Sequence, residues 1–347
     1  MLDKDIYCIH HHATVKDGLS KINDINGDAI FVINDDQHVL GTITDGDIRR
    51  GFLKGITLSD SVSEVMNQNF KHLKQDEFTL EMVDELRKSK IDLIPIIDSE
   101  GKLQKILNFK SKRSILPVQV MLMAGGRGER LRPMTDTLPK PLLPVGNKPI
   151  IEHNIDRLAL YGIENIAISV KYKAELIEDY FKDGSEKGLN ITYIHEKEAL
   201  GTIGAVSFMP EVTSKSLLVM NSDLLTNINY EDFYRFFVNN DADMVVCSIP
   251  YRVDIPYGVL EMDGNKITSL KEKPSYTYYS NGGIYLIKAS LLNRIPKDTF
   301  YNATDLMEDL IQDGKKVLNY PITQYWLDIG KPQDYEKAQE DIKHIQW

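Results

Sequence analysis

The sequence contains little cysteine and no long hydrophobic run. Its 347 residues include 2 cysteines, Cys8 and Cys247, which lie far apart along the chain. This excludes a disulfide framework and a Cys-x-x-Cys metal site, and it suits a reducing compartment. No apolar run approaches the ~18 residues that a membrane-spanning helix needs, and the charged first residues lead into no signal-peptide core. We therefore expect a cytoplasmic protein that does not enter a membrane.

Excess positive charge is also absent. Lysine and arginine number 41 against 51 aspartate and glutamate residues, which gives a formal charge of −10 and a pI near 5.4. Because phosphate backbones select basic surfaces, this balance argues against nucleic acid as a partner. Small anionic substrates need only local positive charge and remain open. The length predicts two domains or one large domain with an addition.

Three consecutive histidines, His10, His11 and His12, form the one tract that suggests a transition metal. Adjacent residues on a strand or helix cannot all face one ion, and no carboxylate or cysteine spacing supports a site here. We interpret the tract as a polar turn before a helix that begins near Thr14 rather than as a set of metal ligands.

Residues 1–115 contain a weak internal repeat, with copies at 1–56 and 57–115. Each copy is predicted as helix, strand, tight turn, strand and helix. The predicted first helices are 15–23 and 80–88, the first strands are 29–33 and 93–97, and the second strands start at 39 and 103. Two such units packed sheet to sheet bury apolar faces that neither buries alone.

The repeat resembles a tandem pair of cystathionine-β-synthase (CBS) domains. In that family the second strand ends in G-x-h-T/S-x-x-D, which the first copy keeps as Gly41, Thr44 and Asp47. The resemblance implies that Thr44 and Asp47 bind an adenosine nucleotide, since a carboxylate can accept both hydrogen bonds of a ribose diol. The alternative is a helix N-cap, which Thr and Asp also serve. The second copy lacks the motif, and the association of CBS pairs implies a homo-oligomer.

Residues 118–347 change to alternating strands and helices after a short linker at 111–117. This alternation predicts an α/β domain with a mainly parallel sheet. The expected strands are 118–123, 165–170, 191–194, 216–220 and 243–249, the helices 151–161, 174–181 and 333–345 with another starting in 203–208, and the hairpin 258–270.

A glycine-rich loop follows the first strand of this domain. Gly125, Gly126 and Gly128 are followed by Arg130, and Arg132 and Lys140 come next. Glycines let the backbone approach an anion closely, so a strand leading into this loop predicts a phosphate site. Glu129 stands where a Walker loop needs lysine, and Leu131 stands where a dinucleotide fingerprint needs glycine or alanine. An ordinary glycine turn beside surface arginines is the alternative.

A carboxylate follows a later strand. Asp223 comes three residues after the end of the apolar strand at 216–220, and ligands of open α/β sheets lie at the carboxyl ends of strands. A capping aspartate is the alternative. Glu272 and Lys273 likewise suit sugar hydroxyls and a phosphate by their chemistry, although a Glu-Lys pair at a strand end is more often a solvated edge.

These motifs together resemble the signature of sugar-1-phosphate nucleotidyltransferases. The string G-G-x-G-x-R-L-x-P-x-T with P-K-P, the segments at 196–205 and 221–223, E-K-P at 272–274 and W-L-D-I-G at 326–330 occur in the family's order. The resemblance implies a Rossmann-like sheet preceded by the α+β CBS module. The implied binding residues are Ala124, Gly125, Gly126, Gly128, Glu196, Gly201 and Thr202 for the nucleotide; Arg130, Lys140 and Asp223 for catalysis; Asp223 and Asp328 for Mg²⁺; and Gly258, Glu272, Lys273, Asn281 and Gly283 for the sugar phosphate.

The implied reaction joins an NTP and a sugar 1-phosphate into an NDP-sugar with release of pyrophosphate. Glu196 favours GTP, because a carboxylate can accept both the N1–H and the N2–H₂ of guanine, but UTP, dTTP and CTP stay open. CBS domains followed by a short catalytic domain resemble the glucosamine-1-phosphate guanylyltransferases of bacterial legionaminic-acid synthesis. Mannose or another hexose or heptose 1-phosphate is the alternative substrate, and a non-catalytic nucleotide sensor is the alternative function.

Overall fold

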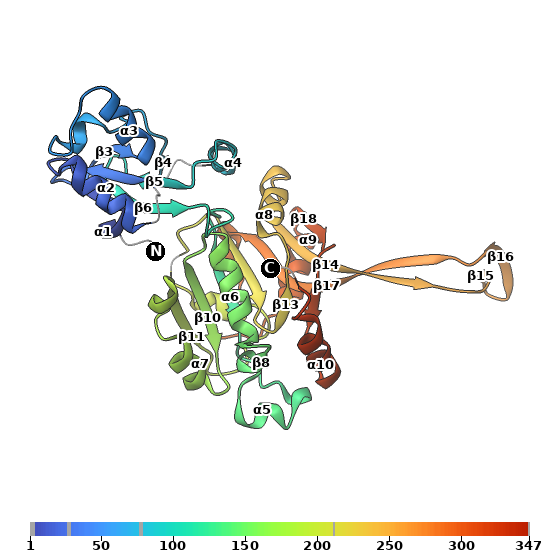
Figure 1. The fold of residues 1–347 in the computed structure, drawn as a ribbon. Coiled ribbons are helices and arrows are strands. Elements are labelled where there is room, and N and C mark those ends of the chain that lie inside the picture. Colours follow the sequence, from blue (N-terminus) through green and yellow to red (C-terminus); the bar gives the residue numbers. More distant parts are fainter. Residues whose placement is uncertain (1–3, 26–28, 76–78, 211, 346–347) are drawn as a thin grey trace. The chain divides into compact units, whose positions relative to one another are not determined.

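The computed structural model describes residues 4–25, 29–75, 79–210 and 212–345 (Figure 1). The chain divides into two compact units, Met1–Ile115 with Leu160–Gly162, and Leu116–Ala159 with Ile163–Trp347. In the described ranges, no helix is both long enough and apolar enough to cross a bilayer.

The first unit contains two copies of one three-stranded sheet, which confirms the internal repeat. In the first copy β1 (Cys8–His10) pairs in parallel with β2 (Ile30–Ile33), which pairs antiparallel with β3 (Val39–Ile43). In the second, β4 (Leu73–Lys74), β5 (Leu93–Ile97) and β6 (Leu103–Asn108) repeat this order and these directions. The helices are α1 (Lys4–Tyr7), α2 (Val15–Asp24), α3 (Asp45–Leu53), η1 (Val62–Glu64) and α4 (Leu80–Lys88).

The closing helix predicted for the second copy is absent, which corrects the sequence interpretation. In the first copy Thr44 and Asp47 form a capping box that starts α3. In the second, Asn108 stands at the end of β6, and its side chain accepts the Lys110 N–H at 2.8 Å. The Asn108 carbonyl accepts the N–H groups of Ser111 and Lys112. The chain therefore closes an Asx turn, because no acid three residues on completes a cap.

The two sheets of the first unit share a core. One buried cluster joins Cys8 and Phe31 of the first copy to Leu93, Leu103 and Ile106 of the second. This confirms that the copies pack sheet to sheet and bury faces that a single three-stranded sheet would leave in water.

The second unit is built on a seven-stranded mixed sheet in the order β11-β10-β7-β12-β17-β14-β18. Strands β7 (Gln119–Met123), β10 (Asn165–Val170), β11 (Asn190–His195) and β12 (Ser216–Asn221) are parallel neighbours. Strand β17 (Ser275–Lys288) runs antiparallel to β12 and to β14 (Met244–Asp254), which pairs in parallel with β18 (Val317–Pro321). The sheet is mostly parallel, as the sequence predicts.

The helices of the second unit follow the predicted alternation with strands. They are α5 (Met134–Thr137), α6 (Ile150–Leu160), α7 (Ala174–Phe181), α8 (Tyr230–Asn239), α9 (Ala303–Gln312) and α10 (Pro332–Asp341), with 3₁₀ turns η2 (Glu129–Leu131), η3 (Lys140–Leu142), η4 (Ser185–Lys187), η5 (Gly204–Phe208) and η6 (Ala289–Arg294). Small strand pairs add β8 (Pro144–Val145) with β9 (Lys148–Pro149), and β13 (Leu224–Thr226) with β19 (Trp326–Asp328). The helix expected to start in 203–208 is the 3₁₀ turn η5.

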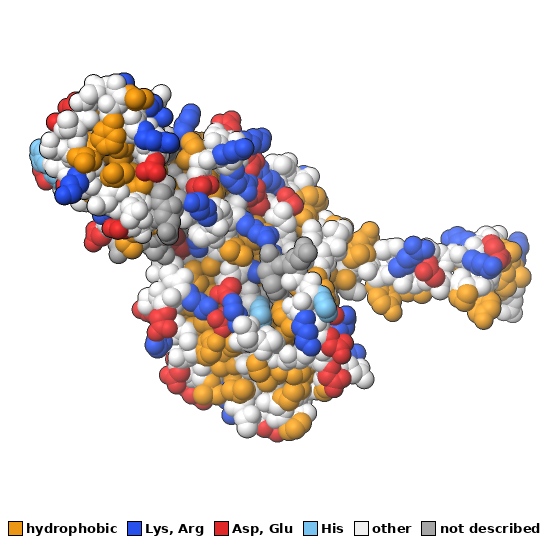
Figure 2. Space-filling model, in the orientation of Figure 1, with side chains coloured by type: hydrophobic (Ala, Val, Ile, Leu, Met, Phe, Trp, Pro, Cys, Tyr) orange, Lys and Arg blue, Asp and Glu red, His pale blue; other side chains and the backbone are white. Residues whose placement is uncertain are grey.

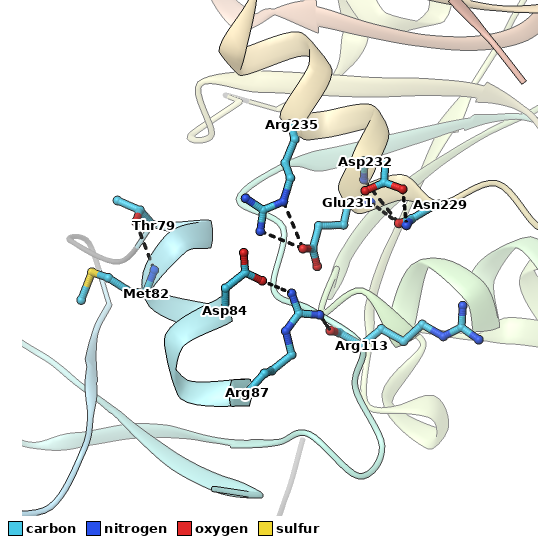
Figure 3. A network of polar contacts seen from close by, with 9 residues as sticks. All are labelled: Thr79, Met82, Asp84, Arg87, Arg113, Asn229, Glu231, Asp232 and Arg235. Atoms are coloured by element: carbon cyan, nitrogen blue, oxygen red, sulfur yellow. Dashed lines mark hydrogen bonds and ion pairs between the residues drawn. The ribbon is translucent and has the colours of Figure 1, made fainter. Parts of the chain in front are cut away.

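Short polar contacts set where helices begin (Figure 3). In the second unit, Asn229 caps α8 by accepting the N–H groups of Glu231 and Asp232, and Arg235 donates to Glu231 Oε1 at 2.8 Å one turn on. In the first unit, Thr79 caps α4 by accepting the Met82 N–H at 3.4 Å. Such caps satisfy N–H groups that have no partner inside the helix.

A long two-stranded arm leaves the sheet of the second unit (Figure 1). Strands β14 and β17 stay paired from Ser248 and Asn281 outward to Asp254 and Ser275. The hairpin β15 (Val259–Asp263) and β16 (Lys266–Lys271) forms its tip. None of residues 251–280 is buried. The sequence predicts the tip hairpin, and the structure adds that this hairpin stands away from the sheet.

Candidate active site

The glycine loop is folded against Lys140. Gly128 has φ +63, and a Cβ there would lie 2.9 Å from Lys140 Cβ and 3.0 Å from Thr135 Cγ2. The Thr135 hydroxyl donates to the Gly128 carbonyl at 3.0 Å. This position therefore needs glycine both for its left-handed backbone and for its close neighbours. A Cβ on Gly126 would meet nothing within 4 Å, so that part of the loop faces open space.

Lys140 lies between two carboxylates. Its Nζ donates to Asp223 Oδ2 and lies 3.7 Å from Asp328 Oδ1. Asp223 lies in the loop between β12 and β13, and Asp328 lies in β19. Strands β13 and β19 are paired, with Leu224 opposite Asp328, and this pairing brings the two carboxylates together. Arg130 reaches the same place, since a Cβ on Gly330 would lie 3.4 Å from its guanidinium. Four charged residues from distant segments thus meet at the carboxyl ends of β7 and β12.

The two carboxylates provide oxygen ligands suited to Mg²⁺. Asp223 Oδ1 and Asp328 Oδ1 are buried and accept no hydrogen bond in the part of the chain that the structure describes. Burial raises the pKa of Asp328, as does the Asp223 charge, and the cations of Lys140 and Arg130 act against this rise. Such carboxylates gain from a bound cation. One or two carboxylates with substrate phosphates form a usual Mg²⁺ shell, so the residues fit the ion that the resemblance implies.

Buried polar residues that the sequence analysis missed hold Asp223 in place. Asn154 of α6 donates from Nδ2 to the carbonyls of Ser222, at 3.2 Å, and Leu224, at 2.8 Å. The Ser222 hydroxyl donates to the Met123 carbonyl at 2.7 Å, which ties the Asp223 loop to the end of β7. No distinct signal in the sequence pointed to this support, because Asn154 is one of several polar residues in α6.

Glu196 lies beneath the glycine loop. A Cβ on Gly125 would lie 2.6 Å from Glu196 Oε1, so the loop backbone crosses the buried carboxylate closely. Glu196 Oε2 accepts the Leu200 N–H at 3.2 Å. Ala124 is buried and donates its N–H to the Ser169 carbonyl at 3.0 Å, which joins the loop to β10. The structure therefore brings Ala124, Gly125 and Glu196 together.

Gly201 and Thr202 pack on the start of α9. Gly201 has φ +77, and a Cβ there would lie 2.6 Å from the Tyr301 carbonyl oxygen. The Thr202 hydroxyl accepts the Ala303 N–H at 2.9 Å. These contacts give both residues a structural role at the start of α9.

Two of the residues assigned to the sugar phosphate lie beside the carboxylates. A Cβ on Gly283 would lie 2.7 Å from Asn221 Nδ2, two residues before Asp223. Trp326, which lies two residues before Asp328, donates its indole N–H to the Gly282 carbonyl at 2.9 Å. Asn281 accepts the Gly283 N–H at 3.0 Å, and so stands at the root of the arm next to the site.

The other three sugar-phosphate residues lie out on the arm. Gly258, Glu272 and Lys273 are exposed, and a Cβ on Gly258 would lie 3.2 Å from Glu272 Oε2. The arm's ladder separates Asn281 from Ser275 by six residues, about 20 Å of extended strand, and Glu272 lies beyond Ser275. Within one copy of the chain, these residues are therefore not gathered with Asp223 and Lys140.

The proposed adenosine residues are engaged with each other. Asp47 Oδ2 accepts the Thr44 N–H at 2.9 Å and the Thr44 hydroxyl at 2.6 Å. Asp47 Oδ1 accepts from Arg50 at 2.6 Å. This is the N-cap that the sequence analysis named as the alternative. To bind Asp47, the ribose hydroxyls of an adenosine nucleotide would have to replace the hydrogen bonds that Asp47 accepts from Thr44 and Arg50.

His10 ends β1, and the expected turn before α2 holds His11 and His12, so the three residues are not all on one strand or helix. His11 and His12 follow β1 in a turn, so their rings gather with that of His10, and one ligand atom of each lies within 4.8 Å of the others. His10 is already engaged, because Nδ1 accepts the His12 N–H at 3.3 Å and Nε2 lies 2.8 Å from Asp35.

Comparisons with known proteins match segments of the chain to two families. The family described as nucleotidyl transferase matches residues 119–345, and the family described as CBS domain matches residues 1–54. A mannose-1-phosphate guanyltransferase from Schizosaccharomyces pombe is 32% identical over 227 residues, 63% of this chain and 62% of that protein. The chain thus spans about three fifths of that relative's length.

Two shorter relatives are covered almost completely. A D-glycero-α-D-manno-heptose 1-phosphate guanylyltransferase from Aneurinibacillus thermoaerophilus is 29% identical over 231 residues, 65% of this chain and 99% of that protein. The solved structure of HddC from Yersinia pseudotuberculosis complexed with GMP-PN is 26% identical, with a TM-score of 0.50, and the match covers 65% of this chain and 99% of that one.

Proposed function

This chain belongs to the nucleotidyl transferase family, and from that membership we propose that it is a sugar-1-phosphate guanylyltransferase. The observation that carries the proposal is the position of Lys140, folded under the glycine loop and held between Asp223 and Asp328. A cation and two metal-binding carboxylates at one point suit a reaction between two anions. A protein that only sensed nucleotides would need no such arrangement.

In the proposed reaction a phosphate oxygen of the sugar 1-phosphate attacks the α-phosphorus of the nucleotide in line. The bond from the α-phosphorus to the bridging oxygen breaks, and pyrophosphate leaves with that electron pair. Arg130 and the loop N–H groups bind the triphosphate, and Lys140 neutralises charge at the α-phosphate. Mg²⁺, held by Asp223 and Asp328, would supply further positive charge at the phosphates.

Guanine is the proposed base. Glu196 is buried, and its Oε1 lies against the backbone of Gly125 while Oε2 accepts a backbone N–H. A fixed carboxylate beside the loop suits the paired donors on one edge of guanine. The similarity to the guanyltransferases of S. pombe and A. thermoaerophilus, and to HddC in complex with GMP-PN, supports the same choice.

The sugar is proposed at the level of an aldose 1-phosphate. The relatives named above are guanylyltransferases of mannose 1-phosphate and of a heptose 1-phosphate, which favours one of these two sugar phosphates as the substrate. Glucosamine 1-phosphate, and with it legionaminic-acid synthesis, remains the proposal drawn from the order of the CBS and catalytic segments. An adenosine nucleotide at Thr44 and Asp47 is proposed as a regulator.

Pyrophosphate release tests these proposals directly. The full chain is assayed with Mg²⁺, with GTP, UTP, dTTP or CTP, and with glucosamine, mannose and D-glycero-α-D-manno-heptose 1-phosphates. We expect release with GTP and one sugar, and its loss in Asp328→Asn. Release with another base replaces the guanine assignment and leaves the reaction in place. A folded chain that releases no pyrophosphate with any pair, with adenosine nucleotides present, would refute the enzymatic function.

A further inference from the structure

The tip of the arm is an amphipathic ribbon. Two cross-strand pairs, Leu260 with Leu270 and Met262 with Ile267, share one face. Their side chains belong to residues that are 50%, 62%, 51% and 57% exposed. The opposite face is polar, and carries the ion pair of Lys271 with Glu261. In the described part of the chain, no segment covers the apolar face.

Such a ribbon needs a partner surface. An isolated two-stranded hairpin is marginal in water, and an exposed apolar face on one marks a contact with something else. The root of the arm is also apolar, with Tyr251 and Tyr278 paired on one face and Tyr279 on the other, each more than half exposed. Figure 2 shows hydrophobic side chains along the arm, including its far end.

The root of the arm lies close to the candidate active site, whereas the charged residues near its tip lie far from it. The root lies beside Asn221, at the end of β12, and beside Trp326 of β19, which are the segments that lead to Asp223 and Asp328. Glu272 and Lys273, whose carboxylate and ammonium suit sugar hydroxyls and a phosphate, lie about 20 Å or more along the ribbon. In their own copy these two charged side chains have no described contact with the site.

A second copy of the chain, related by a two-fold axis, could both cover the apolar face of the tip and place Glu272 and Lys273 at a site. If two arms lie antiparallel about a two-fold axis, the tip of each arm meets the root of the other. The aliphatic face of one tip then packs on the face of the other arm that carries Tyr251 and Tyr278, a self-complementary contact of the kind two-fold dimers use. The same arrangement carries Glu272 and Lys273 of each copy to the Asp223 site of its partner.

We propose that the active site is shared between two copies of the chain, with the arm of one copy supplying Glu272 and Lys273 to the sugar phosphate bound at Asp223 of the other. The proposal rests on the proposed function, because it names the source of the residues that complete that site. Each copy then holds its nucleotide within its own loop and is incomplete without a second arm.

Complementation between two defective chains tests this arrangement. One chain carries Asp223→Asn, and the other carries the arm substitutions Glu272→Gln and Lys273→Met. Each is expected to fall below about one hundredth of wild-type pyrophosphate release when expressed alone, the size of loss seen when a preorganised charge is removed. The two are then co-expressed with different affinity tags, and the mixed oligomer is isolated through both tags.

In a shared site the mixed dimer has one intact site, formed by the unmodified core of one chain and the unmodified arm of the other. We expect it to recover about half of wild-type turnover per dimer. The matched control is the mixed oligomer of Asp223→Asn with Asp328→Asn, in which every core is defective and no recovery is expected.

Three results would overturn the shared site. They are an arm variant with wild-type turnover, a mixed oligomer as inactive as its parents, and a wild-type chain that is active but yields no mixed oligomer. A wild-type chain inactive with every substrate pair contradicts the proposed function instead, and so the two failures are distinguishable.

Discussion

Removing the positive charge of Lys140 should change two measurements in opposite directions. Its Nζ contacts Asp223 and lies 3.7 Å from Asp328, and the Lys140 side chain is 11% exposed. The lysine therefore occupies the position in which the carboxylates would hold a divalent cation. We expect Lys140→Met to lower turnover because it removes charge from the α-phosphate, and to tighten metal binding because it removes a competing cation.

The size of each effect follows from the geometry. A unit charge at 3.7 Å from Asp328 interacts by about 4.5 kcal/mol at an effective dielectric constant near 20. Asp328 is 44% exposed at its side chain, so water reduces this to about 1–2 kcal/mol, or roughly 5- to 30-fold in metal affinity. The turnover loss should be about 10²- to 10³-fold, as for other preorganised charges.

Two assays separate the effects. Binding of Mn²⁺ without substrate, followed by electron paramagnetic resonance, measures the site's affinity, and pyrophosphate release measures turnover. Lys148→Met is the matched control. Lys148 Nζ pairs with Asp156 Oδ2 at 2.5 Å, and neither residue belongs to the site. Circular dichroism verifies that each variant is folded. Weaker Mn²⁺ binding in Lys140→Met, or unchanged turnover, would refute the assignment of Lys140.

Three further predictions concern Asp223, Gly125 and Cys8. Asp223→Asn should cut turnover at least 100-fold and leave the melting temperature nearly unchanged, since a neutral amide holds Mg²⁺ poorly; normal pyrophosphate release would remove Asp223 from the metal site. Gly125→Ala should raise the KM for GTP more than Gly126→Ala, because only the first places a Cβ 2.6 Å from Glu196; equal KM values would contradict the base pocket. Burial raises the pKa of Cys8 from 9.0 to about 11, so at pH 8 its thiolate fraction should be about 100-fold below that of an ordinary thiol. Alkylation of native protein should therefore be slow at pH 8 and rise toward pH 11, and fast labelling at pH 8 would show that Cys8 is exposed.

Local patterns were sufficient to predict most of the secondary structure. The helix α4 has the predicted bounds, and β2, β10 and α7 match to within one residue. Apolar periodicity and turn residues specify such elements because they act between near neighbours in the chain. The prediction of a closing helix in the second repeat was wrong. That segment lacks a local N-cap like the one that starts α3.

The glycine loop and the acidic strand ends were also visible in the sequence, because each is one contiguous string with its own chemistry. What the sequence did not contain was their mutual arrangement. Lys140 and Asp223 lie 83 residues apart in the sequence, and Asp328 lies farther along the chain. Only the pairing of β13 with β19 and the folding of the loop under Gly128 bring the three residues together.

The position of the arm shows the same division most clearly. The sequence by itself determined a hairpin, its alternating apolar face and the charged pair Glu272 and Lys273. Only the tertiary structure decided that this hairpin stands away from its own sheet, because the direction of a ribbon depends on what packs against it and not on the pattern within its strands. Local interactions fix which residues share a face, whereas contacts between distant segments fix what that face meets.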